Sequence, residues 1–244
     1  MPINPNVAGT PMMGFSSPSE FYVGFAGSGT YVLQGLGWPL EDSPAFNTLD
    51  QKTQGGREVM NSLYSNPLHT FKLTFNFLEN QSSYNAEGNP DTDMRMLYSF
   101  YTAMTGRFGE FLYQPRDSAF TYQQLANPDA NTYVEIVLAD GPFFNESVQE
   151  MNGIAPTIYL YNPSGSPPGF TNVTSDCTFY TAGSIAPYSG IVFAYSGSAL
   201  TEGQYLAASG NYYWRVHFDK DNYNFEEFIY ACMKTGIGLS QVRI

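Results

Sequence analysis

The sequence is poor in positive charge. Lysine and arginine together number 10, against 22 aspartates and glutamates, which gives a formal net charge of −12 and a sequence pI near 4.4. Proteins that read nucleic acids need a basic surface that displaces counterions from the phosphates. Adhesion to anionic lipids likewise needs clustered lysine and arginine. The composition therefore argues against both classes of protein.

Long apolar segments and cysteines are also scarce. No segment approaches the roughly 20 apolar residues of a membrane-spanning helix, so we expect no membrane insertion. Residues 1–13 have no charged start followed by an apolar stretch, and we therefore expect no signal peptide and synthesis in a reducing cytoplasm. The two cysteines, Cys177 and Cys232, form no CxxC pair. We interpret them as core thiols rather than as a disulfide or a metal pair.

The residue types that carry most enzyme catalysis are few and scattered. The only two histidines are His69, at the start of an aromatic strand, and His217, on the polar side of another; we expect both to be surface or interface side chains. No GxSxG segment occurs, residues 219–227 lack the ligand spacing and glycine of a calcium loop, and the adjacent pair Glu226–Glu227 points apart in any regular element. We therefore predict no enzyme activity, no catalytic, cofactor-binding or metal-ligating residue, and no cofactor.

Aromatic residues and strand patterns are abundant instead: 43% of residues are apolar and 16% are aromatic. Residues 70–78 alternate strictly, which predicts a half-buried strand, with one face formed by Phe71, Leu73, Phe75 and Phe77. Residues 212–219 alternate in the same way, with Tyr212, Trp214, Val216 and Phe218 on the apolar side. Short apolar runs between Gly, Pro, Ser and Asn clusters predict further strands at 133–139, 157–161, 177–181 and 190–195.

One segment has a convincing helical pattern. Its apolar residues recur at helical spacing, at Met94, Leu97, Tyr98, Tyr101 and Met104. Asp91 or Asp93 is the expected N-cap, and Gly106 the expected left-handed residue after the helix. Residues 224–236 fit a short helix or a strand, and residues 236–244 are expected to end the chain as a strand.

These elements predict a mainly β protein with one helix, in which a body built from both ends of the chain carries an inserted small β domain. We expect the body to comprise residues 46–125 and 208–244, and the inserted peripheral domain residues 126–207. Residues 1–45 are rich in Gly, Ser and Pro. We expect them to form an extended arm with one or two short strands, in the apolar pieces 21–25 and 30–36. We expect a neighbouring subunit to order this arm, because alone such a segment buries too little surface to offset its entropy.

The order of several motifs resembles that of distal tail proteins from tailed phages and gene transfer agents. The N-terminal motifs are an aromatic with Thr, a Gly-Arg-Glu element, a Pro before an aromatic strand, a helix that ends in aromatics and Gly, and a Phe strand with a Pro/Asp turn. Here they are Phe46 and Thr48; Gly56, Arg57 and Glu58; Pro67 with Phe71–Leu78; Leu97, Phe100 and Tyr101 to Gly106; and Phe111 with Pro115–Asp117. Residues 212–221 and 236–244 resemble the closing strands of that family. The chain departs from the family at Met60, where a second Arg is common, and in its longer N-terminal segment.

The resemblance implies a structural virion protein at the tail tip, synthesised in the cytoplasm of a bacterial host: a ring, commonly of six copies, that joins the tail tube to the tip hub of a long-tailed phage. It also implies a body domain of β-sandwich or split-barrel type with a helix, plus a peripheral β domain. The implied partners are further copies of the chain, the tail tube protein, the hub protein and the tape measure protein, with DNA passing through the lumen without specific binding. A different class also fits the aromatic β scaffold: a carbohydrate-binding, lectin-like module or a polysaccharide-active protein for attachment to a host-surface glycan.

Overall fold

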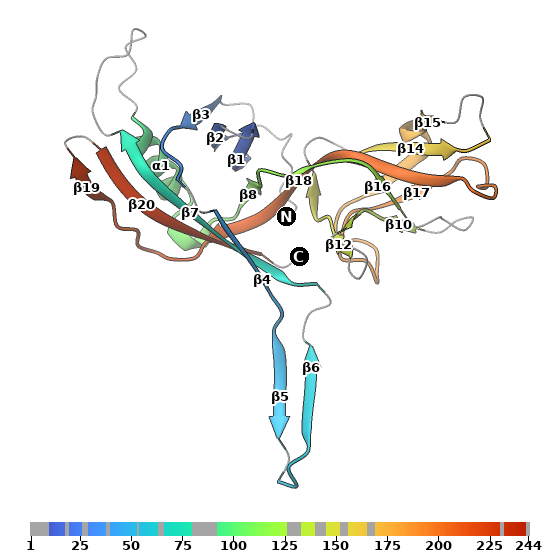
Figure 1. Ribbon diagram of the computed structural model, residues 1–244, viewed down its shortest axis with the longest axis horizontal. Coiled ribbons are helices and arrows are strands. Elements are labelled where there is room, and N and C mark those ends of the chain that lie inside the picture. Colours follow the sequence, from blue (N-terminus) through green and yellow to red (C-terminus); the bar gives the residue numbers. More distant parts are fainter. Residues whose placement is uncertain are drawn as a thin grey trace.

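The protein is mainly β with one α-helix, as the sequence predicts (Figure 1). The computed structural model describes residues 10–17, 20–25, 29–37, 40–52, 54–62, 66–79, 92–125, 133–139, 145–151, 156–164, 169–229 and 232–242. Within these residues, a mixed sheet of 13 strands is accompanied by one sheet of three strands and two sheets of two strands.

The described buried residues form two large apolar clusters, which we use to name two units. The body surrounds the first cluster and comprises β1 (Pro11–Ser17), β2 (Glu20–Phe25), β3 (Gly29–Leu33), β4 (Glu41–Ala45), β7 (Leu68–Glu79), α1 (Asp93–Ala103), a 3-10 turn (Gly106–Phe108), β8 (Phe111–Gln114), the C-terminal half of β18 (Tyr205–Phe218), β19 (Glu226–Ile229) and β20 (Cys232–Gln241). The hairpin of β5 (Thr48–Lys52) and β6 (Glu58–Ser62) projects from the body.

The insert surrounds the second cluster. It comprises β9 (Ala119–Gln124), β10 (Tyr133–Glu135), β11 (Val137–Ala139), β12 (Asn145–Ser147), β13 (Glu150–Met151), β14 (Thr157–Asn162), β15 (Gly169–Asn172), a 3-10 turn (Thr174–Asp176), β16 (Cys177–Tyr180), β17 (Val192–Tyr195) and the N-terminal half of β18. The four short strands that the sequence predicts at 133–139, 157–161, 177–181 and 190–195 are confirmed as β10 with β11, β14, β16 and β17.

The aromatic strand supplies the centre of the body core, with one exception. Phe71, Leu73 and Phe75 of β7 are buried, but Phe77 is 58% exposed. The reason is an irregularity against β20, where Leu78 pairs with Met233 but Phe75 pairs with Thr235. The extra residue in β7 reverses the alternation, so Leu78 turns inward and the expected inward orientation of Phe77 is wrong.

The N-terminal segment is part of the body sheet, so the expected extended arm over residues 1–45 is wrong for its described strands. β1 pairs antiparallel with β2 and parallel with β8, and β2 pairs with β3. Met13, Phe15 and Phe21 lie in the first core cluster. Because these strands bury apolar side chains within their own chain, the described part of the segment needs no neighbouring subunit for its order.

The helix α1 covers one face of the body sheet and buries Leu97 and Phe100 against it. Its N-cap is Thr92, whose Oγ1 accepts a hydrogen bond from the Arg95 backbone N–H at 3.5 Å. The expected cap at Asp93 is therefore wrong, since Asp93 is already helical, and Asp91 lies outside the described residues. Gly106 has the expected left-handed conformation, with φ of 62°.

The long strand β18 joins the two units, because its N-terminal half pairs with β14 and β9 and its C-terminal half with β8 and β20. Trp214 and Val216 lie in the body core, as expected. The opposite face was expected to be polar and exposed, but Tyr213 and Arg215 on it are buried as well. The segment that fitted either a helix or a strand forms the antiparallel pair β19–β20.

Candidate interaction surfaces and a polar junction

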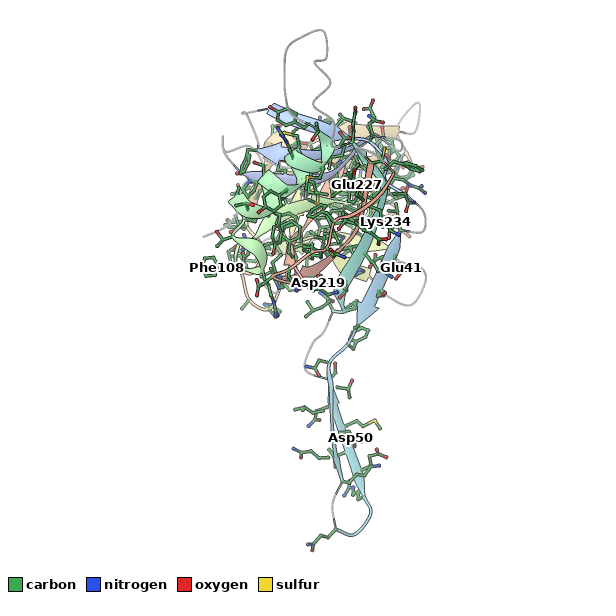
Figure 2. All side chains as sticks on the ribbon, turned by 90° about the vertical axis from the view of Figure 1, so that its left-hand side faces the viewer. Glu41, Asp50, Phe108, Asp219, Glu227 and Lys234 are labelled. Atoms are coloured by element: carbon green, nitrogen blue, oxygen red, sulfur yellow. The ribbon has the colours of Figure 1, made fainter. Side chains whose placement is uncertain are left out.

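The hairpin of β5 and β6 is a candidate interface because it extends beyond the β4–β7 pair and its described strands bury no side chain. Every side chain of its two strands is exposed, and within the described strands β5 and β6 pair only with each other. Figure 1 and Figure 2 both show it extending away from the rest of the molecule. An isolated two-stranded hairpin is marginally stable in water at best, so this hairpin is expected to gain its order from a partner.

The hairpin exposes apolar side chains that a partner could cover. Leu49 and Val59 lie on the same face, because Leu49 pairs with Asn61 and Gln51 pairs with Val59. Their exposed fractions are 47% and 40%, and Met60 on the other face is 64% exposed. Exposed apolar surface that is concentrated on one element indicates an interaction site.

The Gly-Arg-Glu element that contributes to the family resemblance lies at the tip of this hairpin. Gly56 has φ of 79°, a left-handed conformation that favours glycine, and Glu58 begins β6 with an ion pair to Lys52 across the hairpin at 3.7 Å. The ion pair is highly exposed and contributes little stability. The motif residues therefore build the turn of the projecting element.

The body sheet offers a second kind of candidate interface. Its hydrogen-bonded path runs β3-β2-β1-β8-β18-β20-β7-β4, so β3 and β4 are edge strands among the described residues. Tyr31 and Val32 on β3 are 40% and 43% exposed. Edge strands present unpaired backbone groups to which another chain can add a strand.

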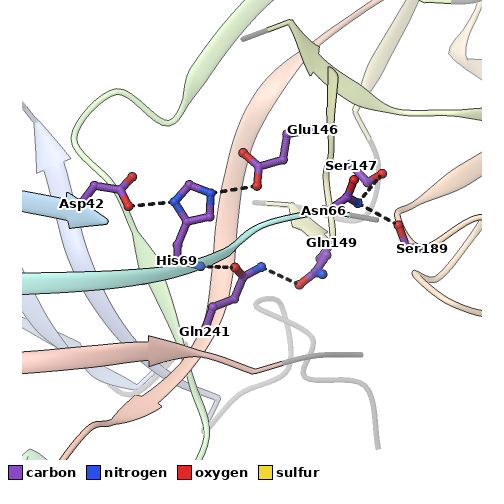
Figure 3. Close-up of polar contacts among 8 residues, drawn as sticks. All are labelled: Asp42, Asn66, His69, Glu146, Ser147, Gln149, Ser189 and Gln241. Carbon is purple, nitrogen blue, oxygen red and sulfur yellow. Dashed lines mark hydrogen bonds and ion pairs between the residues drawn. The ribbon is translucent and has the colours of Figure 1, made fainter. Parts of the chain in front are cut away.

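A buried polar junction connects the body to the insert (Figure 3), and His69 lies at its centre. His69 Nδ1 lies 2.7 Å from Asp42 Oδ1 on β4, and Nε2 lies 2.8 Å from Glu146 Oε1 on β12 of the insert. The imidazole stacks on Trp214, with ring centroids 4.8 Å apart, and on Phe71, at 5.8 Å. Of the expected surface or interface positions, the surface position is wrong for His69, because the residue is 8% exposed.

Charge fixes the protonation state of this histidine. Burial lowers the pKa of His69, but the hydrogen bonds that its ring donates to Asp42 and Glu146, and the charges of both carboxylates, raise it, with a net rise to about 9. A protonated imidazole donates from both nitrogens, which matches an acceptor carboxylate on each side. At neutral pH, His69 is therefore an imidazolium that bridges a body strand and an insert strand.

Neutral hydrogen bonds surround this ion pair and extend the junction. The His69 backbone N–H donates to Gln241 Oε1 at 2.8 Å, and Gln241 Nε2 donates to Gln149 Oε1 of the insert at 3.2 Å. Asn66 Nδ2 donates to Ser147 Oγ and Ser189 Oγ at 3.2 and 3.1 Å. Because the network spans both units, it restrains the orientation of the insert on the body in addition to the continuous β18.

An aromatic layer covers the outer face of the insert sheet. Ile158 and Leu160 of β14 face the second core cluster, so Tyr159 and Tyr161 between and after them face outward. Across the sheet, Tyr161 pairs with Phe170 of β15 and with Tyr205 of β18. Tyr122 of β9 completes the layer by stacking on Phe170, with ring centroids 4.1 Å apart and an interplanar angle of 17°. We call Tyr122, Tyr159, Tyr161, Phe170 and Tyr205 the aromatic face.

The other residues that the sequence raises as possible site residues are His217, the two cysteines and the segment 219–227, and the structure places each of them. His217 Nδ1 lies 2.6 Å from the carbonyl oxygen of Phe218. Cys177 and Cys232 are free thiols, each half-buried. In the segment 219–227, Asp219 Oδ1 accepts a hydrogen bond from Tyr223 Oη at 2.6 Å. Among the described residues no group of three or more His, Cys, Asp or Glu is arranged to hold a metal ion, and no described helix is long and apolar enough to cross a membrane.

Sequence reasoning missed both the hairpin and the junction. The junction joins residues that are 27 and 77 positions apart, which no local pattern reveals. No family model matches the sequence, and no curated protein matches it.

Proposed function

We propose that this chain is a structural virion protein, a distal tail protein that forms a ring between the tail tube and the tail-tip hub of a long-tailed phage. The observation that carries the proposal is the projecting hairpin, which has every strand side chain exposed. A two-stranded hairpin with both faces exposed has little stability of its own, and binding to another chain would stabilise it. The motif order of the sequence supports the distal tail family as the setting, and its Gly-Arg-Glu element forms the hairpin turn.

The body sheet supports a closed assembly of identical copies. Its two edge strands, β3 and β4, lie at opposite ends of the described sheet path. A contact between two different surfaces of the same protein is heterologous, and it closes into a ring when the rotation between copies is a simple fraction of a turn. The hairpin and an edge strand are two such different surfaces.

The net charge of −12 fits a ring through which DNA passes. An anionic lumen wall repels phosphates and so prevents the DNA from adhering. We expect a good share of the acidic residues to line the lumen, and a map of the assembled ring with a neutral or basic wall would remove this part of the proposal.

Electron microscopy tests the proposal. Negative-stain images of the purified chain should show rings with a central hole, and antibodies against the chain should label the tail tip of the particle from which it came. Purified protein without rings, or label on the capsid or along the whole tail, would contradict it.

A second candidate function, host attachment through carbohydrate, is supported by the aromatic face of the insert. Exposed aromatic side chains on a rigid sheet are a common means of ligand contact. A stand-alone lectin of this kind would be a monomer or dimer in solution, whereas the distal tail protein would be a larger ring. Particle mass therefore separates the two candidates.

A further inference from the structure

From the geometry and charge of the aromatic face we infer that it binds a neutral glycan, rather than an acidic polysaccharide, by stacking sugar rings on Tyr122 and Phe170. The inference rests on the second proposed role, host attachment, and it names the binding residues and the class of sugar. Ring formation at the tail tip does not depend on it.

Tyr122 occupies an unusual backbone position for a large side chain. Its φ is 51°, in the left-handed region that costs a residue other than glycine roughly 1 kcal/mol or more. The conformation arises at an irregularity where Ala208 pairs with Gln123 but Gly210 pairs with Phe120. The Tyr122 backbone N–H is held there by Ser209 Oγ at 2.8 Å.

The consequence of this irregularity is the position of the tyrosine ring. Bulges redirect side chains and occur often beside functional sites. Here the Tyr122 ring lies over the sheet, in contact with Tyr159 at a centroid distance of 4.9 Å and stacked on Phe170. Tyr122 remains 44% exposed and Phe170 36% exposed, so both rings keep surface available to a ligand.

Polar side chains of the kind that bind sugar hydroxyls lie beside the aromatic face. Asn172 pairs with Tyr159, and Gln124 pairs with Ala207 on the same outer side of the sheet. Both amide side chains are exposed. The C–H surface of a pyranose carries a slight positive charge and is apolar, so it fits the negative face of an aromatic ring, while amides bond to the hydroxyls at its edge.

Charge selects the class of sugar. Residues 117–214 contain no lysine, arginine or histidine, but they contain eight acidic residues: Asp117, Asp129, Glu135, Asp140, Glu146, Glu150, Asp176 and Glu202. Proteins recognise carboxylate, phosphate and sulfate groups with cationic side chains, and this segment has none. An acidic glycan would be repelled, whereas a neutral one has no charge that needs a partner.

The test uses the full-length chain and titration calorimetry with defined probes. The neutral probes are hexamers of β-1,4-glucose, α-1,4-glucose, β-1,4-galactose and β-1,4-N-acetylglucosamine, and the acidic probe is a hyaluronan hexamer. We expect binding of at least one neutral hexamer and none of hyaluronan.

Variants then locate the site. Tyr122→Ala with Phe170→Ala should weaken binding of the neutral hexamer at least tenfold, and Tyr122→Phe, which keeps the ring, should bind within about threefold of the wild type. Tyr133→Ala is the matched control, because Tyr133 is an insert tyrosine with 37% exposure outside the aromatic face; its affinity should be unchanged.

Three results would overturn the inference: no binding of any neutral hexamer at millimolar concentration, stronger binding of hyaluronan, or full affinity in the double variant. Circular dichroism of each variant shows whether it is folded, and if the double variant does not fold, Tyr122→Ala alone takes its place. Because the readout is sugar binding and not particle mass, failure here is distinguishable from failure of the ring.

Discussion

Replacement of His69 should remove a pH-dependent part of the stability. The folded-state pKa of His69 is about 9, above the ordinary value of 6.5. A group whose pKa is raised by folding stabilises the folded state fully below its unfolded pKa, and this contribution is lost as the pH rises through the folded pKa. For His69, the contribution is complete below about pH 6.5 and absent above about pH 9.

The magnitude follows from the same shift. One pKa unit corresponds to about 1.4 kcal/mol, so the raised pKa sets an upper limit of about 3 kcal/mol for the pH-dependent term. The exposure of the Asp42 side chain, 50%, weakens that half of the ion pair through solvent screening. We therefore expect about 2 kcal/mol.

Urea unfolding of wild type and His69→Gln, at one protein concentration and at pH 6, 7, 8, 9 and 10, measures this term. Glutamine keeps a polar side chain of similar size but carries no charge at any pH. The measured quantity is the unfolding free energy of the wild type minus that of the variant. This difference should be about 2 kcal/mol larger at pH 6 than at pH 10. Titrating groups that do not contact His69 change both proteins alike and cancel in the difference.

Direct titration gives a second readout. The sequence has only two histidines, so the NMR signals of His69 are assigned by comparison with His217→Gln, and they should titrate near pH 9. A stability difference that is constant from pH 6 to pH 10, together with a His69 pKa near 6.5, would refute the ion-pair interpretation of the junction.

Three further predictions concern the body, the hairpin and a buried carboxylate. Phe75→Ala should cost about 3–5 kcal/mol of unfolding free energy, because Phe75 is fully buried, whereas Phe77→Ala should cost less than about 1 kcal/mol; equal costs in chemical denaturation would contradict the register shift in β7. The double variant Leu49→Thr with Val59→Thr preserves strand propensity, so its circular dichroism should match the wild type, but its particle mass by light scattering should fall. The control Phe77→Ala should leave the mass unchanged. An unaltered mass in the double variant would exclude this face of the hairpin from the interface. Burial raises the pKa of Glu150 to about 7, although the charge and hydrogen bond of Arg215 oppose the rise, so ionisation of Glu150 destabilises the folded state as the pH rises through that range. Glu150→Gln should be more stable than wild type by about 2 kcal/mol at pH 8 and by much less at pH 5. A destabilised variant at pH 8 would show that the ion pair with Arg215 dominates.

Elements with a one-sided apolar pattern were predictable from the sequence. The strand at 70–78, the helix around Leu97 and the short strands of the insert each bury one face, and burial leaves a period of two or of about 3.6 residues. Phe77 departed from this rule because a bulge depends on the partner strand, which lies far away in the sequence.

Short strands were predictable within the N-terminal segment, but their place in the body sheet and the existence of the hairpin were not. β1 to β3 contain Gly and Ser that weaken any local strand preference, and they are ordered by pairing with one another and with β8. The hairpin exposes both faces, so no burial imposed an alternating pattern on residues 48–62. Only the Gly55-Gly56 turn marked its position.

The junction shows why the buried histidine was missed. His69 opens the aromatic strand, and a histidine at a strand end is ordinarily solvated. Its burial depends on Asp42 and Glu146, which arrive from a neighbouring strand and from the insert. The sequence does show one property of the insert directly: residues 117–214 contain no cationic residue. This absence is the basis for inferring a neutral rather than an acidic glycan as the ligand.

The central claim is that the chain works as a repeated building block whose projecting hairpin binds another copy. Light scattering of the wild type, beside a variant in which residues 48–62 are replaced by a short Gly-Ser linker, measures this most directly. The wild type should have a mass several times that of the 27.1 kDa chain, close to six copies for the expected ring, and the hairpin-free chain should be a folded monomer. A wild-type monomer at high concentration, or a hairpin-free chain that keeps the full assembly mass, would contradict the claim.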